Sequence, residues 1–174
     1  ASGKSDLAIY LAKKYPIELI SVDSVMVYKD CNIGSAKPCK NILEKHHHHL
    51  VDIVTPDKVF TVADFYKHSI KIIKEIHNKN KLPLFVGGSM MYFKSLYTGI
   101  NDLPERDQKF RDRMIKLKLD SEDFFLHKKL NQIDPDYANK INKNDEVRII
   151  RALEVYKKTG KKMSEIFSDD TKNN

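Results

Sequence analysis

The first five residues, Ala1-Ser2-Gly3-Lys4-Ser5, match the second half of a phosphate-binding P-loop, Gly-x-x-x-x-Gly-Lys-[Ser/Thr]. In such a loop, backbone N–H groups at the start of a helix bind an anion, a lysine adds positive charge, and a hydroxyl completes the shell of a Mg²⁺ ion. Gly3, Lys4 and Ser5 have the residue types for these roles in that order. We expect a phosphate site here with Ser5 on the metal, although five residues alone fit the ordinary start of a helix equally well.

The residues that follow favour the P-loop. Apolar residues between positions 7 and 12 lie at helical spacing, Pro16 stops that helix, and residues 17–22 form an apolar run typical of a buried strand. A helix followed at once by a buried strand is the context that a P-loop requires. The first glycine of the motif and its leading strand would precede residue 1, so we expect the sequence to be cut at this end.

Further helices and strands are predicted up to residue 97. We expect a short strand at 50–54, a helix with a capping box at 61–64 that ends near 78–81, a buried strand at 82–86, and a helix at 90–97. The turn Gly87-Gly88-Ser89 joins the last two elements. It is either a second anion-binding turn at the same edge of the sheet or a place where backbones pack closely.

After residue 102 the pattern becomes helical and strongly charged. Helices are predicted at 107–119, at 121–133 with a stop at Asp134-Pro135, and at 144–158 with Gly160 as C-cap, and no strand pattern returns after Val86. We therefore predict an α/β fold: a P-loop NTPase-like parallel sheet flanked by helices over residues 1–101, followed by an α-helical insertion portion over residues 102–174.

Composition excludes several classes of protein. The 174 residues are 41% hydrophobic and 32% charged, and no apolar run is long enough for a membrane span, which indicates a soluble globular protein. Cys31 and Cys39 lack metal-site or redox-motif spacing, so we expect free thiols in the cytoplasm. The net charge of +7 suits a polyanionic partner, although genome-wide base bias also produces lysine-rich chains. The arginines cluster late, at Arg106, Arg111, Arg113, Arg148 and Arg151.

Four consecutive histidines, His46 to His49, lie inside the chain. Four adjacent imidazoles cannot all face one metal ion on regular structure, so a solvated loop is the favoured interpretation and a metal site the lesser one.

Six segments together resemble the tRNA dimethylallyltransferases, also called isopentenyl transferases, in order from Ala1 to about Ile166. The segments are A-S-G-K-S, I-S-V-D-S-x-x-x-Y, I-G-S-A-K-P, Ala63-Asp64-Phe65, L-F-V-G-G-S-x-x-Y-F-K and N-D-x-x-R-I-I-R-A-L-E-V. The resemblance implies transfer of a dimethylallyl group from dimethylallyl diphosphate to the exocyclic N6 amine of the adenosine 3′ of the anticodon in tRNA.

The same resemblance assigns roles to residues. The P-loop residues Ala1, Ser2, Gly3, Lys4 and Ser5 would hold the diphosphate with Mg²⁺, where Lys4 stabilises the charge of the leaving group. Asp23 would be the general base for the amine, whereas without the resemblance a turn or cap residue is the better interpretation. Contacts with the tRNA anticodon stem-loop, whose target base is flipped into a pocket, are implied for Asp23, Ser24, Val25, Met26, Ser89, Arg111, Val147, Arg148, Ile149, Ile150 and Arg151.

Some points stay open. Arg148 and Arg151, three apart, would point the same way and grip phosphate or a base, although a solvated helix face is the commoner pattern. Tyr28, Tyr92 and Phe93 line the prenyl or base channel or, more simply, pack in the core. The family's further C-terminal section has no counterpart before Asn174, which allows an inactive fragment or a vestigial RNA-binding protein. A P-loop kinase and an isopentenyl transferase for free adenine nucleotides are the rival enzymes, and a monomer is expected.

Overall fold

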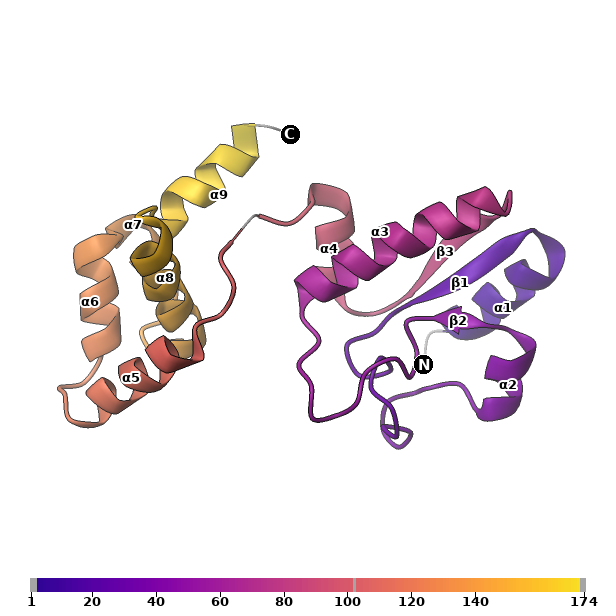
Figure 1. The fold of residues 1–174 in the computed structure, drawn as a ribbon, viewed down its shortest axis with the longest axis horizontal. Coiled ribbons are helices and arrows are strands. Elements are labelled where there is room, and N and C mark those ends of the chain that lie inside the picture. The colour runs from indigo at the N-terminus through magenta and orange to yellow at the C-terminus, as the bar shows by residue number, and fades with distance from the viewer. Residues whose placement is uncertain (1–2, 102, 173–174) are drawn as a thin grey trace. The chain divides into compact units, whose positions relative to one another are not determined.

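The computed structural model describes residues 3–101 and 103–172 (Figure 1). The chain forms two compact units, Ala1–Ile100 and Asn101–Asn174. The first unit combines strands and helices, whereas the described part of the second unit contains helices and no strand. No helix in the described ranges is both long enough and apolar enough to cross a membrane.

A parallel sheet is the centre of the first unit. Its strands β1 (Ile17–Val22), β2 (His48–His49) and β3 (Leu82–Gly87) have the order β2-β1-β3. Strands β1 and β3 pair in parallel over their whole lengths, whereas β1 and β2 share only two residue pairs. Because the strands are parallel, their carboxyl ends meet at one edge of the sheet.

Helices cover both faces of this sheet. Ile20 and Val22 of β1 pack with Phe65 of α3 (Val62–Asn78) and with the helix α4 (Met90–Thr98). Side chains alternate along a strand, so Leu19 points to the opposite face, where it shares a pocket lining with Ala12 of α1 (Lys4–Lys14). The short helix α2 (Lys40–Lys45) precedes β2.

The second unit is built around one buried helix, α8 (Glu146–Thr159). It contacts α5 (Gln108–Leu119), α6 (Phe125–Ile133) and α9 (Met163–Lys172), while the short helix α7 (Pro135–Ala138) follows α6. Six of the residues of α8 are buried, which is a wider stripe than a surface helix usually buries. This helix therefore supplies much of the core of the unit: Ile149, Ile150, Ala152, Leu153 and Val155.

Most of the predicted elements are confirmed, with small shifts at their ends. The strands at 17–22 and 82–86 and the helices at 90–97, 107–119 and 144–158 are present. Thr61 and Asp64 form the predicted capping box: the Thr61 hydroxyl accepts from Asp64 N at 3.1 Å, and Asp64 Oδ2 accepts from Thr61 N at 2.9 Å. Gly160 ends α8 in the left-handed conformation, as expected of a C-cap.

The strand predicted at 50–54 is wrong. Leu50 and Asp52 have positive φ angles of 63° and 55°, which break the extended backbone that a ladder needs. The strand lies two residues earlier, at His48–His49, and Val54 makes only an isolated bridge with Tyr28. The solvated loop expected for the histidines is therefore also wrong for these two: His48 is buried, and His49 is hydrogen-bonded to Glu18.

Three helices were not predicted, and one is shorter than predicted. These are α2, α7 and α9, while α6 begins at Phe125 rather than at 121. Asp134 and Pro135 end α6 as predicted, but they also begin α7, because Asp134 Oδ1 accepts from Tyr137 N at 3.1 Å and Pro135 occupies its first turn.

Candidate active site

The carboxyl ends of β1 and β3 approach each other closely at Val22 and Gly87. A Cβ atom on Gly87 would lie 2.0 Å from the carbonyl oxygen of Val22, so only glycine fits here. The backbone N–H groups of Gly88 and Ser89 both donate to that same oxygen, each at 3.1 Å. Close backbone packing is therefore the correct interpretation of the Gly-Gly-Ser turn, because the two N–H groups that an anion would need already have an acceptor.

Asp23 follows β1 at this edge and is held in a tight turn. Its Oδ1 atom accepts hydrogen bonds from the backbone N–H groups of Val25, at 2.8 Å, and Met26, at 3.1 Å. Ser24 N donates to the Ser89 hydroxyl oxygen at 3.1 Å, which ties this turn to the end of β3. Oδ2 of Asp23 accepts no hydrogen bond from the residues that the structure describes. The half-buried carboxylate thus has one oxygen bound within the turn and one oxygen, Oδ2, with no donor among the described residues.

The aromatic residues near Asp23 belong to the core or to its margin. Tyr92 is buried and stacks on Phe65, with ring centroids 4.1 Å apart and planes 10° apart. Burial raises the pKa of Tyr92, and the charges of Tyr28, Asp23 and Asp64 raise it further, so its phenol stays protonated. The Tyr28 hydroxyl accepts from the N–H of Phe60 at 3.0 Å.

Phe93 packs against the same cluster as Tyr92. Core packing, the simpler of the two predictions for these aromatic side chains, therefore holds for Tyr92 and Phe93.

The predicted P-loop residues lie at the start of α1. Gly3 caps this helix in the left-handed conformation, with φ of 69°, and Lys4 and Ser5 are the first exposed residues of the helix. Ala1 and Ser2 lie outside the described residues. A two-residue connection reverses the chain between α1 and β1, so the first turn of α1 lies toward the carboxyl ends of the strands, as do Asp23 and Ser89.

This arrangement is compatible with a Mg²⁺ ion whose oxygen ligands come mainly from water and a bound substrate rather than from the protein. The described residues contain no group of three or more histidines, cysteines or carboxylates that could hold a metal. Ser5 is exposed and offers a hydroxyl oxygen, the kind of hard ligand that Mg²⁺ accepts. Mg²⁺ at Ser5 would take its other oxygens from water and from a phosphate-bearing substrate, as it commonly does in proteins.

In the second unit, Glu154 draws together two of the predicted tRNA-binding arginines. Its carboxylate, which has no exposed surface, accepts from Arg111 Nε at 2.9 Å and Nη2 at 2.8 Å, and from Arg151 Nη1 at 2.6 Å. The backbone N–H of Asp107 is a further donor at 2.6 Å, and Arg151 Nη2 also donates to the carbonyl oxygen of Pro104 at 2.9 Å. Burial alone would raise the pKa of Glu154, but these hydrogen bonds lower it to about 2.

The remaining predicted residues of α8 divide between surface and core. Val147 and Arg148 are exposed, and Arg148 pairs with Asp145, the N-cap of the helix, at 2.7 Å. Arg148 and Arg151 therefore have different partners, Asp145 and Glu154, and Arg148 is the more exposed of the two. Ile149 and Ile150 are core residues, and burial leaves their side chains almost no surface to offer to RNA.

Two charged residues with clear structural roles were not singled out from the sequence. Glu154 lies three residues after Arg151 on the same helix, a spacing that could have suggested their ion pair. Lys37 is buried in the loop before α2 and donates to the carbonyl oxygen of Tyr28 at 2.9 Å and to Asp52 Oδ1 at 2.6 Å. No local pattern indicates the contact between Lys37 and Asp52, because 15 residues separate the two.

Comparison with known proteins decides the family. The family model described as IPP transferase matches residues 26–174, which is most of the chain. The chain belongs to the IPP transferase family. It is 45% identical over 166 residues to the tRNA dimethylallyltransferase of Vesicomyosocius okutanii subsp. Calyptogena okutanii (strain HA), covering 95% of this chain and 54% of that protein.

A second relative and two solved structures agree with this assignment to the IPP transferase family. The tRNA dimethylallyltransferase of Francisella tularensis subsp. tularensis (strain WY96-3418) is 48% identical, with the same coverage of 95% and 54%. A structure of a eukaryotic dimethylallyltransferase acting on tRNA has a TM-score of 0.76 at 32% identity and covers 95% of this chain and 41% of that one. The full-length tRNA isopentenylpyrophosphate transferase of Bacillus halodurans has a TM-score of 0.57 at 38% identity, covering 92% and 53%.

The predicted fold class is thereby confirmed: an α/β, P-loop NTPase-like parallel sheet flanked by helices, with an additional helical portion. The chain spans about half the length of the curated relatives of the IPP transferase family that it matches.

Proposed function

We propose that this chain is part of a tRNA dimethylallyltransferase, which transfers a dimethylallyl group from dimethylallyl diphosphate to N6 of the adenosine 3′ of the anticodon. One observation carries the proposal beyond family membership. The carboxylate of Asp23, with Oδ2 left unbonded by the described residues, lies at the edge of the sheet toward which the first turn of α1 points.

The first turn of α1 would bind the departing diphosphate. Breaking an allylic C–O bond leaves negative charge on the diphosphate and positive charge on carbon. Backbone N–H groups at a helix start and the ammonium group of Lys4 stabilise that negative charge more in the transition state than in the substrate. In the proposal, Mg²⁺ bound at Ser5 supplies further positive charge when present.

Asp23 would act on the other substrate. The N6 amine of adenine is a weak nucleophile because its lone pair is delocalised into the ring. As the new N6–C bond forms and the C–O bond to diphosphate breaks, the amine must lose one proton, and Oδ2 of Asp23 accepts it. Ser89, which accepts a hydrogen bond from Ser24 N in the same turn, would help to orient the flipped base.

The second unit would supply part of the tRNA contact. Val147 and Arg148 are exposed on α8, and Arg111 and Arg151 keep part of their side-chain surface exposed although both bind Glu154. Arginine is well suited to phosphate because its fork of N–H donors forms two parallel hydrogen bonds. We leave Ile149 and Ile150 out of the proposed contact.

The proposal also includes Mg²⁺ as cofactor, a cytoplasmic location and a monomeric state. Both cysteines, Cys31 and Cys39, are free thiols, which suits a reducing compartment. Sedimentation measures the oligomeric state directly.

The test is transfer of labelled dimethylallyl from its diphosphate to an anticodon stem-loop in the presence of Mg²⁺. This chain and a version with the full length of its relatives should be compared, each with and without Lys4→Ala. We expect transfer by at least the longer version, and Lys4→Ala should weaken diphosphate binding and slow transfer. Absence of transfer by both versions would refute the proposal, and phosphorylation of a nucleotide instead would identify a P-loop kinase.

A further inference from the structure

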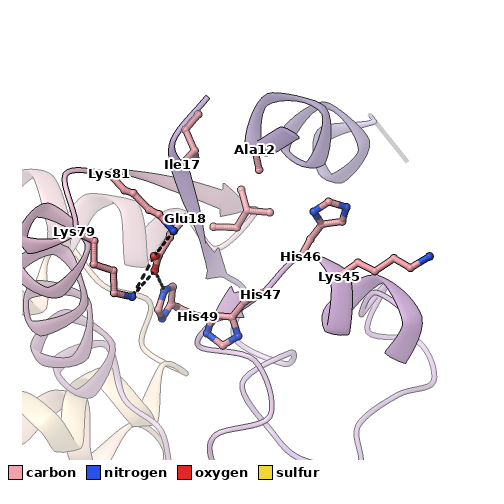
Figure 2. A pocket seen from close by; sticks show the side chains of 10 residues that line it. Ala12, Ile17, Glu18, Lys45, His46, His47, His49, Lys79 and Lys81 are labelled. Carbon is pink, nitrogen blue, oxygen red and sulfur yellow. Dashed lines mark hydrogen bonds and ion pairs between the residues drawn. The ribbon is translucent and has the colours of Figure 1, made fainter. Parts of the chain in front are cut away.

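A pocket of about 390 Å³ opens at the opposite edge of the same sheet from Asp23 (Figure 2). Ile17 and Glu18, the first two residues of β1, form part of its lining, so the pocket lies at the amino ends of the parallel strands. The rest of the lining comes from Leu19 of β1, helices α1 and α2, the segment 46–49, and the turn before β3. Small-molecule sites have volumes of roughly 300 to 1,000 Å³, and this pocket falls in that range.

The lining is strongly basic. Its charged and titratable members are Glu18, Lys45, His46, His47, His49, Lys79 and Lys81. The lining contains three lysines and one carboxylate, which leaves an excess of two positive charges when the histidines are neutral. A concave surface with one sign of charge concentrates ions of the opposite sign.

Glu18 accepts hydrogen bonds from three of these side chains and so fixes their positions, but its single charge does not cancel theirs. It accepts from Lys79 at 3.1 and 3.2 Å, from Lys81 at 3.1 Å and from His49 Nε2 at 2.8 Å, as the dashed lines in Figure 2 show. Burial acts to raise the pKa of Glu18, but these partners lower it to about 2, so the carboxylate is ionised at neutral pH.

Hydrogen-bond donors remain after Glu18 is satisfied. An ammonium group has three N–H donors, and Lys81 gives one of them to Glu18. The ammonium group of Lys45 makes no hydrogen bond or ion pair with the residues that the structure describes, and in Figure 2 this side chain extends away from Glu18. Excess positive charge and spare donors lining a concave pocket favour the binding of an anion.

We propose that this pocket binds a small phosphate-bearing anion, such as inorganic phosphate or diphosphate. The dimensions favour a small molecule over a nucleic-acid backbone, which needs an extended basic stripe rather than one compact pocket. This site is separate from the proposed diphosphate site at α1, since the two lie at opposite edges of the sheet.

The probe is diphosphate, titrated into this chain with NMR detection of backbone amides. Signals of residues 45–49 and 79–81 report on the pocket, and signals of residues 3–5 report on the start of α1. Because each site has its own signals, failure of the proposed active site and failure of this pocket are distinguishable. Inorganic phosphate and an anticodon stem-loop serve as separate titrations.

Two variants and one matched control complete the experiment. Lys81→Gln keeps an N–H donor for Glu18 but removes a charge, and should weaken binding in the pocket about tenfold. Lys45→Ala removes the more exposed charge and should weaken it about threefold. Lys74→Ala removes the same charge from an exposed position on α3 outside the pocket and should have no effect.

Saturable shifts at residues 45–49 and 79–81 would support the proposal if Lys81→Gln weakens binding more than Lys45→Ala does. Three outcomes would overturn it: shifts confined to residues 3–5, equal weakening by Lys74→Ala, or shifts at the pocket with the stem-loop but with neither phosphate compound.

Discussion

Arg111 and Glu154 are joined by two parallel hydrogen bonds, Nε to Oε1 at 2.9 Å and Nη2 to Oε2 at 2.8 Å, although 43 residues separate them. Their link connects α5 to α8, and the carboxylate has no exposed surface. A buried carboxylate is tolerated only when its oxygens are fully bonded, so removal of its charge leaves Arg111 and Arg151 without their partner.

We therefore expect Glu154→Gln to destabilise the second unit by about 3 kcal/mol, the lower part of the range for breaking a buried ion pair, because both arginines are partly exposed. Urea unfolding followed by the NMR signals of α8 measures the effect on this unit alone. The control is Glu146→Gln on the same helix, whose exposed ion pair with Lys118 should contribute less than about 1 kcal/mol. Equal effects of the two variants would contradict the structural role of Glu154.

The Glu154 carboxylate should make the stability of the second unit depend on pH. The pKa of Glu154 is lowered from 4.5 to about 2, so its contribution to stability is fully present above pH 4.5 and is lost as the pH falls toward 2. A shift of this size corresponds to at most about 3 kcal/mol. The difference in unfolding free energy between the wild-type chain and Glu154→Gln should therefore shrink between pH 4.5 and pH 2, as measured by urea unfolding at each pH. A difference in unfolding free energy that stays constant with pH would show that the charge of Glu154 does not cause its contribution to stability.

Elements with local signals could be predicted from the sequence. Strand β1 is a continuous apolar run, and α3 begins with Thr61 and Asp64 at the spacing of a capping box. The position of Asp23 follows in the same way, because it comes directly after a strand. Each of these features depends on residues that are close in sequence, which is why pattern and propensity were sufficient.

Features that depend on distant partners could not be predicted. β2 contains two histidines and no apolar residue, and it is a strand because its backbone pairs with Leu19 and Ile20, some 29 residues earlier. The contact of Arg151 with the carbonyl oxygen of Pro104, 47 residues away, is a second example. Spacing on one helix shows which side chains are neighbours, but not which of them the fold will bury.

The close approach of β1 and β3 gives a prediction with a matched control. A Cβ on Gly87 would meet the backbone of Val22 at 2.0 Å, and backbone atoms cannot move aside as the end of a flexible side chain can. Gly87→Ala should cost about 3 kcal/mol in the stability of the first unit, by strain between the paired backbones of β1 and β3. A Cβ on Gly88 meets nothing within 4 Å, so Gly88→Ala should change stability little. Thermal unfolding of both variants measures this, and a stable Gly87→Ala chain would contradict the close approach of Gly87 to Val22.

Arg148 is the exposed arginine of α8 for which we propose a phosphate contact. Arg148→Ala should weaken binding of the anticodon stem-loop and reduce by about one the slope of log K against log salt, without effect on binding of dimethylallyl diphosphate. Arg148→Lys is the control, since it retains the charge and should retain most of the slope. Binding measured by fluorescence anisotropy over a range of salt concentrations gives both slopes. An unchanged slope in Arg148→Ala would exclude the contact.

The variant Asp23→Asn distinguishes the structural role of Oδ1 from the proposed catalytic role of Oδ2. Asparagine keeps a carbonyl oxygen that can accept from Val25 N and Met26 N, so the turn at the end of β1 should persist and both substrates should still bind. The amide that replaces Oδ2 cannot accept a proton, so transfer should slow by a factor of about 10² to 10⁴. Asp23→Ala removes both functions and should also destabilise the turn. Single-turnover transfer and substrate binding, measured on the same samples, distinguish a lost base from a lost site. Normal turnover in Asp23→Asn would leave Asp23 with only its structural hydrogen bonds to Val25 and Met26.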